Sequence, residues 1–156
     1  ALGIEDAELG QELAEKFPEE RRKHPFIYED TFEVLDQLKG CVKLLLLTNG
    51  SPQLQTTKLE ITPEIAPYFD HIVISGDFGQ GKPAPELFEH AVGLLEVEKK
   101  EVLMVGDNLM TDILGSNRAG IKNVWINREG KQRNEVEPTY EIGHLEELFT
   151  ILENWK

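Results

Sequence analysis

The stretch that decides the fold is Val102–Gly120, VLMVGDNLMTDILGSNRAG. Its first four residues are apolar, with a β-branched valine at each end, which is typical of a strand buried on both faces of a parallel sheet. Gly106 ends this strand, and Asn108 is a suitable N-cap for a helix that continues toward Gly120. The pattern therefore predicts a strand-to-helix unit of an α/β domain.

Two acidic residues follow this predicted strand. Asp107 lies at its carboxyl end, and Asp112 lies in the first turn or two of the helix. Open α/β sheets bind ligands at this end, where two carboxylates directed at one crevice repel each other unless a hard cation such as Mg²⁺ lies between them. Helix capping is the competing interpretation, because an acidic residue in the first turn complements the helix dipole without any metal.

Composition restricts the possible functions. With 156 residues, 40% of them hydrophobic and 29% charged, the chain fits one soluble domain with a sizeable core. A net charge of −13 argues against nucleic-acid and membrane partners, because phosphate groups would be repelled unless a cation lies near. Cys41 is the only cysteine, which excludes an internal disulfide and predicts a small core residue. Without a long apolar run or a signal peptide, we expect a cytoplasmic protein.

A second strand-to-helix unit lies upstream. The apolar run Val42–Leu47 predicts a buried strand that ends at Thr48, and Asn49 and Gly50 form a turn before Ser51 caps the next helix. In such a turn the Thr48 hydroxyl and neighbouring backbone N–H groups can bind a phosphate oxygen. The alternative is that Thr48 is an ordinary turn residue.

A third unit begins with a predicted strand at His71–Ser75 and continues into a glycine-rich loop, GDFGQGKP. This loop nearly matches a nucleotide-binding phosphate loop, but Pro83 stands where that motif requires a hydroxyl. A lysine in a glycine-rich loop is commonly solvated. Because Lys82 follows the carboxyl end of a strand, its position favours a role in ligand binding.

The alternation of strands and helices predicts a doubly wound, Rossmann-like α/β fold with a mostly parallel sheet and flanking helices. Residues 1–24 have a thin helical stripe and too little apolar surface to fold alone. The next helix carries Phe32, Leu35 and Leu38 at helical spacing, with Asp30 and Glu33 as an N-cap pair.

With these motifs in place, the chain resembles the haloacid dehalogenase superfamily of hydrolases, in the branch with a helical cap. Three of the four family motifs occur in order: LLLLTNG with Thr48, GKPAPELF with Lys82, and VGDNLMTDI with Asp107 and Asp112. The resemblance implies that Lys82, Thr48 and Asp112 are catalytic and that Asp107 and Asp112 hold Mg²⁺.

The resemblance also implies that Thr48, Asn49, Gly50 and Lys82 bind the substrate. It further implies that residues 1–27 are the C-terminal part of a helical cap and that residues 28–156 are the core domain, without its first strand.

The chain departs from the family at the first motif, since it contains no Asp-x-Asp. We therefore expect an intact protein that hydrolyses a small phosphomonoester through an aspartyl-phosphate, with the nucleophile in a missing N-terminal segment and this chain alone inactive. That segment, or a strand from a neighbouring chain, would lie between the strands at Val42–Leu47 and Val102–Val105. The alternatives are a non-catalytic or degenerate binding module and a haloacid dehalogenase.

Overall fold

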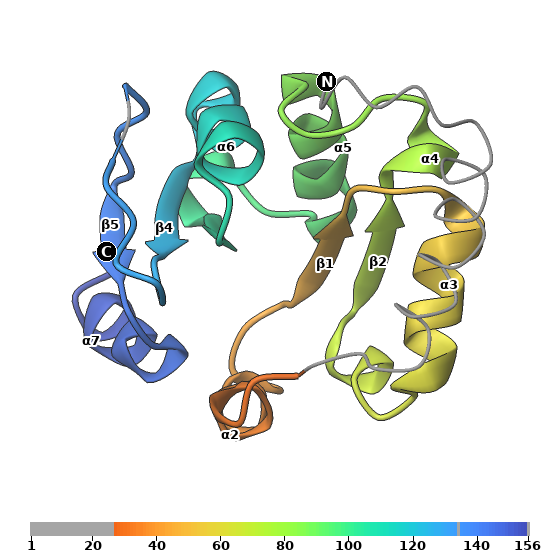
Figure 1. Cartoon of the computed structure of the whole chain (residues 1–156), viewed down its shortest axis with the longest axis horizontal. Helices are drawn as coiled ribbons and strands as arrows, with labels where there is room; N and C mark the ends of the chain where they lie inside the picture. Colours follow the sequence, from red (N-terminus) through yellow and green to blue (C-terminus); the bar gives the residue numbers. More distant parts are fainter. Residues whose placement is uncertain (1–26, 134, 156) are drawn as a thin grey trace, which may run out of the picture.

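A computed structural model describes residues 27–133 and 135–155 of the chain, in which five short strands form two sheets (Figure 1). The strands are β1 (Leu45–Thr48), β2 (His71–Ile74), β3 (Leu103–Gly106), β4 (Lys122–Ile126) and β5 (Tyr140–Ile142). β1 pairs with β2, and the second sheet has the order β3-β4-β5. All three pairings are parallel, so the predicted α/β fold with parallel strands is confirmed.

Helices connect the strands, and the turn residues start them as the sequence predicts. Ser51 caps α3 by accepting a hydrogen bond from the Leu54 N–H, and Pro85 is the first residue of α5. The main helices are α2 (Asp30–Leu38), α3 (Pro52–Ile61), α4 (Ser75–Phe78), α5 (Pro85–Leu95), α6 (Leu114–Ala119) and α7 (Leu148–Glu153). Short helical turns complete the connections at η1 (Ala66–Tyr68), η2 (Lys99–Glu101), η3 (Leu109–Ile113) and η4 (Leu145–Glu147).

Side chains of β3 alternate between two apolar clusters. Leu103 and Val105 pack against the cluster that includes Val34 of α2 and Leu148 of α7, whereas Met104 packs against the cluster formed around Phe88 of α5. This alternation follows from the period of two in a strand. Helices therefore cover both faces of the sheet, as a doubly wound fold requires.

β1 and β3 each have one hydrogen-bonded neighbour among the described residues, and they do not pair with each other. Every residue of both strands is half-buried, whereas Asn123, Val124 and Trp125 of the inner strand β4 are fully buried. Apolar clusters cover both faces of β3, so only the expected complete burial of β1 and β3 is wrong for these residues. A strand with an unpaired edge keeps part of its surface exposed, which explains the difference.

The start of α2 also differs from the prediction. Asp30 and Glu33 do not form an N-cap pair, since the N-cap residue is Glu29 and it makes no side-chain cap. The Asp30 carboxylate instead accepts hydrogen bonds from Arg128 at 2.8 Å and from the Leu145 backbone N–H at 3.0 Å. Arg128, which is distant in the sequence, thus pairs with the carboxylate that the local sequence predicts as a helix cap.

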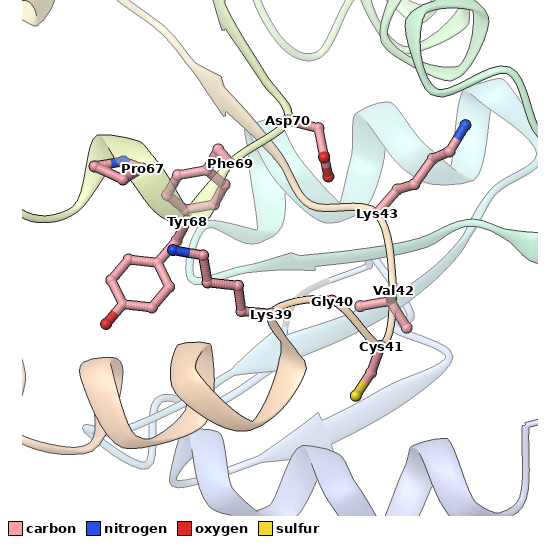
Figure 2. Close-up of a pocket in the computed structure, with 9 residues that line it drawn as sticks. All are labelled: Lys39, Gly40, Cys41, Val42, Lys43, Pro67, Tyr68, Phe69 and Asp70. Atoms are coloured by element: carbon pink, nitrogen blue, oxygen red, sulfur yellow. The ribbon is translucent and has the colours of Figure 1, made fainter.

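Cys41 is exposed, so the expectation that it is a core residue is wrong. It lines a hollow of about 510 Å³ whose other walls include Lys39, Lys43, Tyr68 and Asp70 (Figure 2). This hollow lies before the first residues of β1 and β2, at the end of the strands opposite to Thr48.

No helix among the described residues has the length and apolar character needed to cross a bilayer. The expected cap segment, residues 1–27, lies outside the described residues except for residue 27.

The ion pair between Asp30 and Arg128 predicts a pH-dependent contribution to stability. Burial of Asp30 opposes its ionisation, but the hydrogen bonds from Arg128 and the Leu145 N–H lower the pKa of Asp30 below its ordinary value overall. The ion pair therefore stabilises the protein fully above the ordinary pKa of Asp30. This stabilisation is lost as pH falls through the lower pKa that Asp30 has in the folded protein. In Asp30→Asn, the acid-induced loss of unfolding free energy should be smaller than in the wild type.

Chemical denaturation of the intact protein at neutral and acidic pH measures this difference. Glu33→Gln, an exposed acid on the same helix, is the matched control and should behave like the wild type. The same acid-induced loss in wild type and Asp30→Asn would contradict the assignment.

Candidate active site

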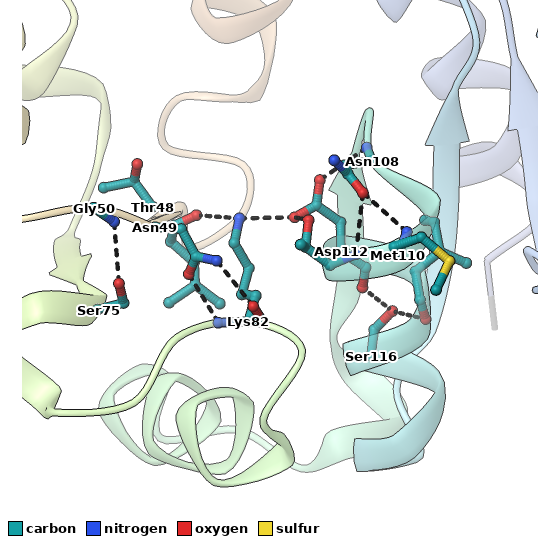
Figure 3. Close-up of polar contacts among 12 residues, drawn as sticks. Thr48, Asn49, Gly50, Ser75, Lys82, Asn108, Met110, Asp112 and Ser116 are labelled. Atoms are coloured by element: carbon teal, nitrogen blue, oxygen red, sulfur yellow. Dashed lines mark hydrogen bonds and ion pairs between the residues drawn. The ribbon is translucent and has the colours of Figure 1, made fainter. Parts of the chain in front are cut away.

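Lys82 lies at the centre of the site, between the end of β1 and the helical turn after β3 (Figure 3). Its Nζ donates a hydrogen bond to the Leu47 carbonyl oxygen at 2.9 Å and pairs with Asp112 Oδ1 at 2.7 Å. Only 11% of the Lys82 side chain and 6% of the Asp112 side chain are exposed. The alternative that Lys82 is a solvated loop lysine is therefore wrong.

The backbone of Lys82 is held by Asn49, in the turn after β1. The Asn49 side-chain NH₂ donates to the Lys82 carbonyl at 2.9 Å, and its Oδ1 accepts from the Lys82 backbone N–H at 2.8 Å. Such paired bonds orient the loop, because they satisfy a backbone donor and a backbone acceptor at once. These bonds bring the predicted turn at Asn49 and the glycine-rich loop at Lys82 into one site.

Asp112 is positioned by the strand end and by the turn η3. Its Oδ2 accepts from the Asn108 backbone N–H at 3.1 Å, while the Asn108 side chain accepts from the backbone N–H groups of Met110 and Thr111. A Cβ atom at Gly106 would lie 2.5 Å from Asp112 Cβ, so only glycine allows this approach. Asn108 is thus the cap that the sequence predicts, and Asp112 is a buried partner of Lys82.

Thr48 and Gly50 are held by two residues that the sequence did not indicate, Gln55 and Ser75. The Thr48 hydroxyl donates to Gln55 Oε1 at 3.1 Å, and the Gly50 N–H donates to Ser75 Oγ at 3.1 Å. Gly50 has a φ of +146°, and a Cβ there would lie 2.3 Å from Gln55 Nε2. In the sequence, Gln55 is a polar residue on the inner side of α3. This position alone does not distinguish a glutamine that bonds to the turn from a solvated glutamine.

Asp107 is exposed at the carboxyl end of β3, and its backbone carbonyl accepts a hydrogen bond from the Trp125 indole at 3.0 Å. It lines a hollow of about 370 Å³ together with Tyr28, Arg128 and Lys131. The hydrogen bond from Lys131 to Glu129, with the charge of Glu129, raises the pKa of Lys131, and the charge of Asp107 adds to this effect. The hollow is therefore lined by two carboxylates, of Asp107 and Glu129, with cations close by.

The donor chemistry at this end of β3 suits Mg²⁺, which binds through one or two carboxylates and completes its shell with water and phosphate oxygens. Asp107 offers an exposed carboxylate of this kind, and Asp112 is five residues away along the chain. Residues 27–133 and 135–155 contain no group of three His, Cys, Asp or Glu side chains arranged as a closed metal site. Any metal here would thus need further ligands from water, substrate or another segment.

Comparison with known proteins gives a consistent assignment. Residues 3–120 match the family of haloacid dehalogenase-like hydrolases. The chain is 38% identical over 143 residues to a phosphoserine phosphatase of Thermus thermophilus, and 37% identical over 155 residues to the N-acylneuraminate-9-phosphatase of Mus musculus. Among solved structures it resembles the HAD hydrolase YfnB of Bacillus subtilis bound to magnesium, with a TM-score of 0.86 and 31% identity.

The chain therefore belongs to the haloacid dehalogenase-like hydrolases. It spans only part of these relatives: the matches cover 91%, 97% and 96% of this chain but 57%, 62% and 65% of the two phosphatases and YfnB, respectively. The family resemblance seen in the sequence is confirmed, and the roles of individual site residues remain predictions.

The buried contact between Lys82 and Asp112 predicts that Lys82→Met destabilises the fold. From the sequence alone, this substitution is expected to cost catalysis far more than stability, because a solvated lysine contributes little to folding. The geometry changes the expected stability effect, since the substitution leaves a buried carboxylate without its cation. The cost should be about 3–5 kcal/mol of unfolding free energy.

Denaturant unfolding of the intact protein measures this cost, with Lys131→Met as a control at an exposed lysine that is expected to change the stability little. The double variant Lys82→Met/Asp112→Asn should recover most of the loss, because the amide keeps an acceptor for the Asn108 N–H without a buried charge. Similar small effects for Lys82→Met and Lys131→Met would show that the ion pair does not stabilise the protein.

Proposed function

We propose that the intact protein is a Mg²⁺-dependent phosphatase that hydrolyses a small phosphomonoester through an aspartyl-phosphate. The observation that carries the proposal is the buried Lys82 ammonium at the carboxyl ends of β1 and β3, beside the Thr48 turn. A cation in a water-poor site stabilises the charge of a phosphoryl group far more than a solvated cation does. The phosphatase relatives support this reaction class.

In this proposal each residue has a distinct role. Lys82 binds a phosphoryl oxygen and the nucleophile, Asp112 orients Lys82, and Thr48, Asn49 and Gly50 form the turn that receives the phosphoryl group. Asp107, with Asp112, holds the Mg²⁺ ion, which when bound offsets the negative charge of phosphate and nucleophile. The hollow beside Asp107 can accommodate the rest of a small substrate.

The nucleophile and the general acid are proposed to come from a strand outside residues 1–156, because this sequence contains no Asp-x-Asp. The free edges of β1 and β3 support this idea. Neighbouring strands lie about 4.8 Å apart, so a strand inserted between two edges about 10 Å apart would pair with both. It would bring its carboxyl end to the loop that holds Lys82. A strand donated by a neighbouring chain would satisfy the same edges.

Asp107→Asn tests the metal role. In the intact protein this substitution should abolish Mg²⁺-dependent turnover of a generic phosphomonoester and leave the melting temperature nearly unchanged, because it removes charge from an exposed side chain without changing its volume. Steady-state kinetics over a Mg²⁺ titration, with a thermal melt of each variant, provide the measurement. Asp77→Asn, an exposed acid after β2, is the matched control and should keep full activity. Full activity of Asp107→Asn would remove Asp107 from the site.

A peptide test addresses the missing strand. Residues 1–156 alone should unfold without a single sharp transition or should self-associate, because several unpaired backbone groups, each costing about 1–3 kcal/mol, together exceed the stability of a typical domain. Addition of a peptide that carries the first strand of the intact protein should restore one cooperative transition in calorimetry. A scrambled peptide is the control. One cooperative transition of monomeric residues 1–156 without any peptide would contradict the proposal.

A further inference from the structure

The peptide group between Asp107 and Asn108 is held from both sides. Its carbonyl oxygen, on Asp107, accepts a hydrogen bond from the Trp125 indole Nε1 at 3.0 Å. Its N–H, on Asn108, donates to Asp112 Oδ2 at 3.1 Å (Figure 3). A trans peptide group is planar, so its C=O and N–H point in opposite directions within one plane. Two partners on opposite sides therefore fix the orientation of the whole group.

Trp125 is a rigid partner for this peptide group. It lies in the inner strand β4, opposite Gly106 of β3, and 2% of its surface is exposed. Its ring belongs to the same buried apolar cluster as Leu109 and Ile113 of the turn η3. A closely packed ring cannot turn its N–H to another acceptor without losing these contacts. Since the indole has one donor and no acceptor, its hydrogen-bonding capacity is used entirely on the Asp107 carbonyl.

This peptide group connects the two carboxylates that the proposed function assigns to Mg²⁺. Asp107 carries its carbonyl end, and its N–H end orients the carboxylate of Asp112. If the peptide group rotated, the Asp107 side chain would move with it and Asp112 Oδ2 would lose a donor. Mg²⁺ tolerates little displacement of its ligands, because it requires near-ideal octahedral geometry. The placement of both carboxylates thus depends on one peptide plane.

We propose that Trp125 is a positioning residue for Mg²⁺ binding, whose indole N–H fixes the peptide group between Asp107 and Asn108 and thereby sets both carboxylates for the ion. This inference rests on the proposed function, in which Asp107 and Asp112 hold Mg²⁺. Groups that orient metal ligands contribute about 10–100-fold to metal affinity. Because Trp125 acts through a backbone carbonyl, we expect the lower end of this range, about tenfold.

Trp125→Phe removes the indole N–H and keeps an aromatic ring in the cluster. Calorimetric titration of the intact protein with Mg²⁺ alone, without substrate, measures the affinity directly. The dissociation constant should rise about tenfold in the variant. In turnover of a generic phosphomonoester, the Mg²⁺ concentration that gives half of the maximal rate should rise by a similar factor. The rate at saturating Mg²⁺ should stay near the wild-type value, because Trp125 touches no reacting group in this proposal.

Val124→Ala is the matched control. Val124 is fully buried and precedes Trp125 in β4, but it belongs to the other apolar cluster, with Val34 and Leu148. The substitution destabilises the protein through a cavity and leaves the bond to the Asp107 carbonyl in place. Its affinity for Mg²⁺ should therefore match that of the wild type. An equal loss of affinity in Val124→Ala and Trp125→Phe would mean that general loosening of the fold weakens the site, and would overturn the inference.

An isosteric replacement separates the N–H from the shape of the ring. In β-(3-benzothienyl)alanine a sulfur atom stands in place of the indole N–H, so the side chain nearly keeps its volume and loses its donor. If thermal melts show that Trp125→Phe does not fold, this replacement at position 125 decides the inference. It should bind Mg²⁺ about tenfold more weakly than the wild type does. Wild-type affinity would overturn the role of the indole N–H.

The same titrations distinguish this inference from the proposed function. Absence of Mg²⁺ binding by the wild-type protein, or full binding by Asp107→Asn, would overturn the proposed metal site and the role of Trp125 with it. Full binding by Trp125→Phe, together with loss of binding in Asp107→Asn, would overturn only the role of Trp125.

Discussion

The contacts of one ammonium group connect the two halves of this protein. The Lys82 Nζ bonds to the Leu47 carbonyl of the first sheet and to the Asp112 carboxylate beside the second sheet. Since β1 and β3 share no backbone hydrogen bonds, this polar contact and the packing of α5 against α6 hold the carboxyl ends of the two sheets together. The proposed function uses the same ammonium to bind an anion, so in this proposal stability and ligand binding depend on one side chain.

The proposed site combines an anion ligand with an acidic protein. The chain carries a net charge of −13, which produces a repulsive field for phosphate over most of its surface. At short range the local arrangement matters more, because a buried cation is screened less by water and salt than exposed charges are. Asn49 strengthens this effect by holding the backbone of Lys82 in place. In the proposed function, local charge and not net charge therefore determines what this edge of the sheet binds.

The proposed site is chosen by its position in the fold and not by the size of a hollow. The larger hollow, of about 510 Å³, lies at the amino ends of β1 and β2, where backbone and side-chain groups such as the Leu44 N–H and the Asp70 carboxylate already pair with each other. The smaller hollow, of about 370 Å³, lies at the carboxyl ends of β3 and β4 and is lined by Asp107 and Lys131. Ligands of parallel α/β sheets bind at the carboxyl ends because the strands present their loops and helix starts there.

The sequence by itself determined the features that depend on neighbouring residues. Strand-to-helix units, the Ser51 and Asn108 caps, and the order of Thr48, Lys82 and Asp107 along the strand ends follow from short-range geometry, which a few residues specify. Tertiary structure decided the features that depend on distant partners. Asp30 bonds to Arg128 from 98 residues away instead of capping α2, and Gln55 of α3 accepts a hydrogen bond from the Thr48 hydroxyl. Burial and hydrogen-bond partners depend on which groups meet in space, and local sequence patterns do not contain that information.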